Sequence, residues 1–268
     1  MKFYKIYFLP ILIFLFCFHS GCSNLSDNPE IDIDLVNTEL SEDEIHFINI
    51  ITDYELDFYK TVFHSEFPEI KIKIFGDSLE YSEYQKKISS SRAKNGFYSS
   101  SKKLIIVNKN DRYLKTVSHE INHFILRHFI YDVPKWINEG LSEYFECAKL
   151  ENGNIVIELQ NKKLRRLATW IHEKDKIDFS DFFKWSNKKW REVNYNTNFY
   201  SSTISWGLIY FFMHDETNRY FLVELIRNIK NGADDYDLLE KLYPGGIKQL
   251  QYDFFVYIDL ILANNSLS

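Results

Sequence analysis

The pentapeptide HEINH at residues 119–123 constrains this chain more than any other stretch. On an α-helix, residues four apart lie on the same face, so the imidazoles of His119 and His123 can converge on one metal ion, with the Glu120 carboxylate beside them. Apolar residues follow at 124–126, so this helix is predicted to be partly buried. Buried polar side chains need partners, and a metal ion supplies them. The sequence therefore predicts one Zn²⁺ ion held by the two histidines.

The residues around the motif indicate what such an ion would do. Zinc with three protein ligands keeps a position for water and lowers the pKa of that water to about 7. Glu120 would accept the proton as the water attacks a carbonyl group, and would then deliver a proton to the leaving amine. Leu126 and Phe129 stand where the metzincin pattern requires Gly and His, so that subclass is excluded.

A second helix is predicted to supply the third ligand. Pro134 favours a break in the chain before a new helix begins. Glu139 then falls in its first turns and is the predicted ligand, while Glu143, one turn further on the same face, is predicted to orient a ligand histidine through its free ring N–H. The alternative is an ordinary solvated acidic face, to which Glu146 would also belong.

The two motifs together resemble a known family. HExxH followed by WINEGLSEYF at residues 136–145 is similar to the gluzincin metallopeptidases, specifically the peptidase-MA-like group, whose helix reads W-x-x-E-G-[LA]-[AS]-E-Y. The resemblance runs from about residue 96 to about residue 258 and includes the segment YPGG at 243–246. It implies a zincin-like fold, zinc-dependent peptidase activity and a peptide or protein substrate.

The same resemblance assigns a role to a tyrosine. In the family, a helix after the metal ligands begins with Tyr, and here Tyr200 begins the predicted helix that ends at Phe212. Its hydroxyl would stabilise the developing oxyanion as a preorganised donor. Ser201 and Ser202 stand where the family has a small residue and Gln. The alternative is a tyrosine that only packs at the start of a helix.

The N-terminus has the features of a lipoprotein leader. Lys2 and Lys5 precede an apolar run at residues 6–18, which is too short to span a bilayer comfortably and fits a signal-peptide core. The sequence HSGC then resembles a bacterial lipobox, in which Cys22 would be lipidated and become the mature N-terminus. An ordinary cleaved signal peptide or a retained anchor helix are the alternatives. With residues 1–21 removed and Cys22 lipidated, Cys147 would have no cysteine partner for a disulfide.

Local patterns predict the remaining organisation. Residues 22–40 are polar and acidic and are predicted to form a flexible tether. Residues 41–110 form a small α/β part, with a helix starting at Ser41, a strand at residues 70–75 and a hairpin at residues 96–108. The resemblance implies that the hairpin strand just before the zinc helix is an edge strand, to which an extended substrate could add, and the alternative is a strand that only covers the core. Residues 111–268 form a mostly helical catalytic part, so the fold class is α+β.

Composition excludes one class of partner and leaves the functional alternatives open. The net charge is −6 and the sequence pI is about 5.8, which gives no basic surface for nucleic acid. The favoured function is zinc-dependent peptide hydrolysis by a membrane-anchored lipoprotein at the bacterial cell envelope. One alternative is a non-catalytic envelope lipoprotein that has a structural or vestigial zinc site and binds a partner. Another is an enzyme with the same metal chemistry that acts on a non-peptide amide.

Overall fold

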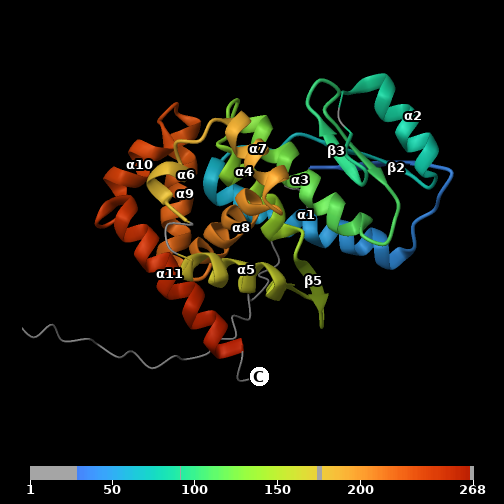
Figure 1. The fold of residues 1–268 in the computed structure, drawn as a ribbon. Coiled ribbons are helices and arrows are strands. Elements are labelled where there is room, and N and C mark those ends of the chain that lie inside the picture. Colours follow the sequence, from blue (N-terminus) through green and yellow to red (C-terminus); the bar gives the residue numbers. More distant parts are fainter. Residues whose placement is uncertain (1–28, 91, 174–176, 266–268) are drawn as a thin grey trace, which may run out of the picture.

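The computed structural model describes residues 29–90, 92–173 and 177–265. The predicted signal peptide and the predicted lipidation site Cys22 lie outside these ranges. Within them, no helix is both long enough and apolar enough to cross a bilayer. The fold is α+β, as predicted, with a small sheet near the N-terminus and a mainly helical C-terminal half (Figure 1).

Four strands form the sheet, in the spatial order β1-β2-β4-β3. They are β1 (Ile31–Val36), β2 (Ile70–Phe75), β3 (Gly96–Ser99) and β4 (Leu104–Asn108). β1, β2 and β4 are parallel, and β3 is antiparallel to β4. The predicted strand at 70–75 and the predicted hairpin are confirmed. The predicted edge position of β4 is wrong, because β4 also pairs with β2, so the edge strand is β3.

The prediction that residues 22–40 form a flexible tether is wrong for β1. Its isoleucines Ile31 and Ile33 pack against the main core, while the acidic residues alternate with them. Asp34 lies opposite Lys73 of β2 and forms an ion pair with it. Opposite charges on facing residues stabilise neighbouring strands. The acidic character of this segment therefore reflects a pairing with a strand 39 residues later, which local composition does not reveal.

Alternate residues of β4 serve two different packing layers. Ile105 and Val107 join the main core with α1 (Glu42–Phe63) and α3 (Tyr113–Phe129). Ile106 faces the opposite side, where a smaller cluster packs beneath α2 (Ser78–Ile88). The sheet therefore separates α2 from α1 and α3 (Figure 1).

Helix α1 starts where its sequence predicts. The Ser41 hydroxyl accepts a hydrogen bond from the Glu44 N–H at 3.2 Å, and the Glu44 carboxylate accepts one from the Ser41 N–H at 2.8 Å. This reciprocal pair satisfies two backbone donors that a helix start otherwise leaves without partners. The helix then packs along α3, so the predicted metal-binding helix has a long buried neighbour.

The C-terminal half surrounds one central pair of helices, α4 (Lys135–Phe145) and α8 (Tyr200–Phe212). Between them in the chain come a two-stranded hairpin and three helices. These are β5 (Ala148–Glu151), β6 (Asn154–Ile157), α5 (Asn161–His172), α6 (Phe179–Phe182) and α7 (Asn187–Asn196). Three helices complete the half, namely α9 (Glu216–Lys230), α10 (Asp235–Leu242) and α11 (Gly246–Asn265).

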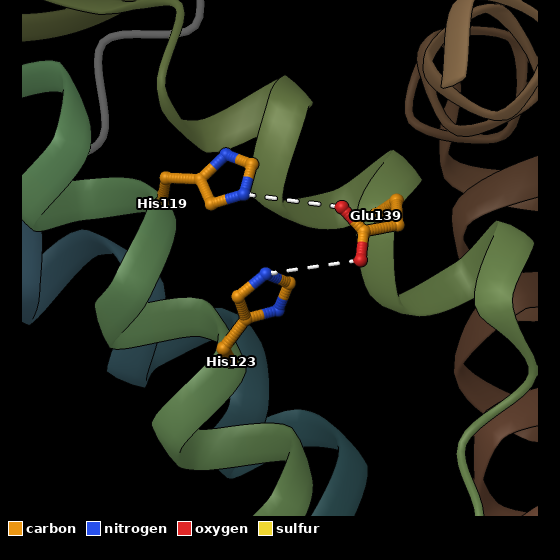
Figure 2. A group of neighbouring side chains, drawn as sticks. All are labelled: His119, His123 and Glu139. Carbon is orange, nitrogen blue, oxygen red and sulfur yellow. Dashed lines mark ion pairs between the residues drawn. The ribbon is translucent and has the colours of Figure 1, made fainter. Parts of the chain in front are cut away.

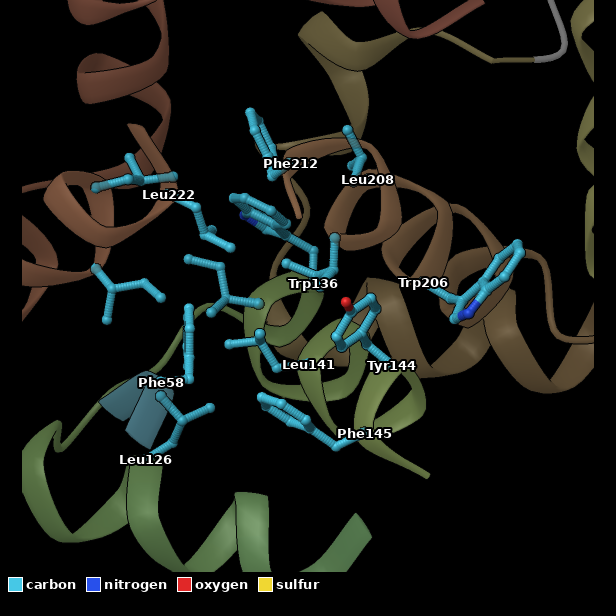
Figure 3. Close-up of a cluster of buried hydrophobic side chains, with 14 of the residues drawn as sticks. Phe58, Leu126, Trp136, Leu141, Tyr144, Phe145, Trp206, Leu208, Phe212 and Leu222 are labelled. Carbon is cyan, nitrogen blue, oxygen red and sulfur yellow. The ribbon is translucent and has the colours of Figure 1, made fainter. Parts of the chain in front are cut away.

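The contact between α4 and α8 is unusually close. A Cβ atom at Gly140 would lie 2.6 Å from the backbone oxygen of Ser205 and 2.7 Å from a side-chain carbon of Ile209. Only glycine lets the two helices approach to this distance. Aromatic and aliphatic side chains fill the space around the contact (Figure 3), among them Trp136, Leu141, Tyr144, Phe145, Leu208 and Phe212.

Candidate metal centre

Helix α3 presents both motif histidines to the same space. The imidazole rings of His119 and His123 lie 4.8 Å apart between centroids and are perpendicular to each other. Most of the helix is buried against α1 and the sheet, but these two side chains keep 19% and 13% of their surface exposed. The spacing of four residues therefore places two imidazoles side by side at the rim of the core, as predicted.

Helix α4 places a carboxylate opposite the two rings. One oxygen of Glu139 lies 4.0 Å from His119 Nε2, and the other lies 4.0 Å from His123 Nε2 (Figure 2). The donor atoms of these three residues all lie within 4.8 Å of one another. A tetrahedral ion with bonds of about 2.1 Å holds its ligands ~3.4 Å apart, so a small inward movement would allow all three to bind one ion.

Each histidine is hydrogen-bonded at the nitrogen that faces away from Glu139. His119 Nδ1 lies 3.0 Å from a carboxylate oxygen of Glu146. His123 Nδ1 lies 3.1 Å from Asn138 Oδ1 and 3.0 Å from Ser142 Oγ. A carboxylate can only accept, so we assign the proton of His119 to Nδ1, and the amide and hydroxyl oxygens support the same tautomer of His123. Both Nε2 atoms then face the space in front of Glu139, where each can bind a metal ion in the neutral form of its ring.

The predicted orienting role of Glu143 is wrong, because Glu146 contacts the histidine instead. The Glu143 carboxylate accepts a hydrogen bond from Lys163 of α5 at 2.7 Å. α3 and α4 meet in opposite directions, so the earlier histidine, His119, faces the end of α4 that Glu146 caps. The sequence shows both acidic residues but not this crossing of the helices.

Glu120 lies beside the cluster and is nearly buried, with 6% of its surface exposed. Its Oε2 accepts a hydrogen bond from the backbone N–H of Tyr98 on the edge strand β3, at 2.8 Å. Burial raises the pKa of Glu120 to about 7, and the negative charge of Glu139 acts in the same direction. A carboxylate with a pKa near 7 can both accept and donate a proton at neutral pH, which suits a general base.

The electrostatics of the cluster favour a cation. Burial alone would raise the pKa of Glu139, but the neighbouring imidazoles and the Lys135 ammonium group lower it to about 2, so this carboxylate is ionised. Burial lowers the pKa of His123 to about 3, so that ring is neutral. Burial alone would lower the pKa of His119, but Glu146, Glu120 and Glu139 raise it to about 10. Three carboxylates therefore converge on one small region, where they attract positive charge. Two imidazoles and a carboxylate are the donor set typical of zinc.

Lys135 is a member of the site that sequence reasoning missed. Its ammonium group lies 2.7 Å from Glu139 Oε1, and its side chain is only 16% exposed. The spacing of four residues from Glu139 on a helix that begins after Pro134 is a signal that could have identified it.

The structure does not bring Tyr200 to the histidines through any contact it describes. Its ring packs against Trp170 and Trp185, with centroids 4.8 and 6.3 Å away. Burial raises the pKa of Tyr200 to about 12, and the negative charges of Asp181 and Asp178 add to this effect. Its assignment as oxyanion donor therefore stays a prediction.

Comparison with protein families gives a match to part of the chain. The model of a family described as "Protein of unknown function (DUF1570)" matches residues 113–232. The matched segment runs from the start of α3 to just beyond α9 and includes His119, Glu120, His123 and Glu139. No curated protein matches the chain. The segment that this family model matches thus contains the candidate metal centre.

Proposed function

We propose that this protein is a zinc-dependent metallopeptidase of the gluzincin type. The observation that carries the proposal is the convergence of His119 Nε2 and His123 Nε2 on the two oxygens of the Glu139 carboxylate, 4.0 Å from each. Two imidazoles and one carboxylate leave a zinc ion an open coordination position, as catalytic zinc sites require. The buried Glu120 beside them provides the base that such a reaction needs.

The roles of the residues follow from their positions. His119, His123 and Glu139 would hold the ion, while Glu146, Asn138 and Ser142 orient the two rings. When bound, zinc supplies a Lewis acid and lowers the pKa of water to about 7. Glu120 accepts the proton of the attacking water and then passes a proton to the amine that leaves the cleaved peptide bond.

The edge strand β3 offers a place for the substrate. Among the strands that the structure describes, its one neighbour is β4, so no described strand pairs with the other side of β3. The Tyr98 N–H on this side donates to Glu120, so the side lies beside the proposed catalytic base, and an added strand would have to compete with Glu120 for this donor. A peptide that pairs with β3 as an added strand would run past Glu120 in an extended conformation.

The proposed setting is the bacterial cell envelope. The basic and apolar leader followed by Cys22 supports a lipoprotein that is attached to the membrane through the lipidated cysteine. The substrate would then be a peptide or protein outside the cytoplasm. Metabolic labelling with a radioactive fatty acid checks this part, since a Cys22→Ala variant should lose the label.

The decisive test compares wild type with Glu120→Gln. We expect wild type to bind one zinc ion and to cleave members of a peptide library, and a chelator should remove both properties. Glu120→Gln should retain zinc and lose hydrolysis, because glutamine cannot accept the proton. Glu151→Gln, an exposed substitution of the same kind on β5, is the matched control and should cleave normally.

Other results of this test would point elsewhere. Zinc binding without cleavage of any peptide would favour a partner-binding lipoprotein with a structural zinc site. Cleavage of amide compounds but not of peptides would favour a non-peptide amide as substrate. Normal peptide cleavage by Glu120→Gln would exclude Glu120 as the base.

A further inference from the structure

Two hydrogen bonds join α1 to the metal-binding helix at the residues that directly precede its histidines. Ser118 Oγ donates to Glu55 Oε1 at 2.8 Å, and the Tyr59 hydroxyl donates to Asn122 Oδ1. The two pairs are one helical turn apart on both helices. α1 therefore contacts α3 through polar groups beside each proposed ligand, although most of their interface is apolar.

Both pairs are deeply buried. Glu55, Tyr59 and Asn122 have no exposed surface, and Ser118 has 1%. Burial raises the pKa of the Tyr59 hydroxyl well above its usual value, so it is a proton donor at any ordinary pH. Buried polar groups are costly without partners, and an apolar pair of similar shape can be about as stable. Stability alone thus gives little reason for Tyr59 and Asn122 to be polar.

The Tyr59–Asn122 pair continues to a proposed metal ligand, and the other pair does not. Asn122 Nδ2 donates to Ser142 Oγ at 2.6 Å and to the backbone oxygen of Asn138 at 3.2 Å. Ser142 Oγ lies 3.0 Å from His123 Nδ1. In contrast, Glu55 Oε2 is buried without a hydrogen-bond partner among the described residues, so the hydrogen bonds of that pair end at Glu55.

The donors and acceptors along this path are used in a consistent way. Ser142 Oγ donates its one proton to the backbone oxygen of Asn138 at 2.9 Å. Its two lone pairs are then left for the Asn122 amide and for the His123 Nδ1–H. The Tyr59 hydroxyl fixes the Asn122 side chain with its oxygen toward α1 and its NH₂ group toward Ser142. Together with Asn138 Oδ1, which also lies beside His123 Nδ1, the path favours the tautomer that carries the proton on Nδ1.

We infer that Tyr59 and Asn122 are positioning residues of the metal centre, which fix the orientation and tautomer of His123 through Ser142. The inference rests on the proposed function, because it assumes that His123 binds the ion through Nε2. It also makes α1 part of the site. This helix contributes no metal ligand, but through Tyr59 it helps to fix the geometry of the ligand His123.

The test measures metal binding rather than activity, on the full chain. The variants are Tyr59→Phe, which removes one hydroxyl, and Asn122→Leu, which replaces the amide by an apolar group of similar size. We expect Asn122→Leu to weaken zinc binding about 10- to 100-fold, the usual effect of losing a group that orients a ligand, and Tyr59→Phe by a smaller factor. The zinc dissociation constant comes from competition with a chromophoric chelator.

A spectrum distinguishes positioning from a general loss of packing. Co²⁺ in place of zinc reports the ligand geometry by its visible absorption, and we expect this band to change in both variants. Ser118→Ala is the matched control, because it removes a hydrogen bond between the same two helices that does not lead to a ligand side chain. It should leave the spectrum unchanged and the dissociation constant within about twofold of wild type.

Each outcome has a definite meaning. If wild type binds neither zinc nor Co²⁺, the proposed function and this inference both fall. If wild type binds them and folded Tyr59→Phe and Asn122→Leu bind equally well with the same spectrum, the inference alone falls. An equal change in Ser118→Ala would also overturn it, because the effect would then come from docking of α1. Circular dichroism shows which variants fold, and Tyr59→Phe is conservative enough to decide the question by itself.

Discussion

The two histidines of the candidate metal centre are supported in different ways. The partner of His119 is a charged group, the Glu146 carboxylate, whose other oxygen lies 3.8 Å from Arg112 near the surface. The partners of His123 are the neutral groups of Asn138 and Ser142, which are 2% and 0% exposed. One side of the site is thus ionic and partly open to solvent, and the other is neutral and closed.

This difference separates two ways of fixing a ligand. A hydrogen bond to a carboxylate is strong and makes the imidazole a better ligand, but salt screens it where it is exposed. A buried neutral network does not respond to salt, but each member that is removed leaves another group without a partner. We therefore expect changes on the His119 side to affect metal binding alone, and changes on the His123 side to affect folding as well.

The largest effect should come from the residue that both sides share. Glu139→Gln removes the charged metal ligand that lies opposite both histidines. If the three ligands contribute comparably to a total of about 10–16 kcal/mol, the loss of one costs about 3–5 kcal/mol and weakens zinc binding by more than about 100-fold. Equilibrium dialysis against buffered zinc measures it. Unchanged affinity would mean that Glu139 is not a ligand, and the comparison of the two sides would lose its basis.

Next in size is a change on the His119 side. Glu146→Gln keeps a hydrogen-bond acceptor but removes the charge, and we expect zinc binding to weaken about 10- to 100-fold with little change in the free energy of unfolding. Glu143→Gln is the matched control on the same helix, because Glu143 contacts Lys163 and not a histidine. A larger effect of Glu143→Gln on zinc affinity would restore the role that the sequence suggested for it.

On the His123 side, Ser142→Ala should lower the free energy of unfolding. The substitution leaves the buried Asn122 amide without its acceptor at 2.6 Å, which costs about 1–3 kcal/mol. Chemical denaturation in the presence of a chelator isolates this effect from metal binding. If Ser142→Ala proved as stable as wild type while Glu146→Gln proved unstable, the assignment of the two sides would be reversed.

The smallest effect concerns Lys135, whose ammonium group lies 2.7 Å from Glu139. A lysine beside a bound divalent cation repels it and also competes for the carboxylate. Lys135→Met keeps the length of the side chain without the charge, so we expect zinc binding to become severalfold tighter, as measured by competition with a chelator. Weaker binding would instead show that Lys135 holds Glu139 in place for the metal.

Sequence patterns predicted the features that depend on neighbours a few residues apart. The spacing of His119 and His123, the capped start of α1 at Ser41 and the alternation in β2 are of this kind, and the structure has all of them. The pairing of Lys135 with Glu139 also follows from their spacing of four residues on one helix.

What the sequence did not show depends on pairings across the fold. β1 looked like an acidic tether because its partner strand lies 39 residues away at Lys73. Glu146 rather than Glu143 supports His119 because α3 and α4 meet in opposite directions. Asn122 stands at an unspecified position of the HExxH motif, and its importance emerges only with Tyr59 and Ser142 around it.

Because Gly140 has no side chain, α4 can contact the backbone of α8, so the position of the third proposed ligand depends on a distant part of the chain. Glu139 is the immediate neighbour of Gly140, and α4 touches the backbone of α8 at this point. A shortened protein that ended after β6 would still contain every donor atom and the contacts of α4 with α3, but α4 would lose its support from α8. Ion affinity should therefore reach its full value only when the last hundred residues have folded around α4.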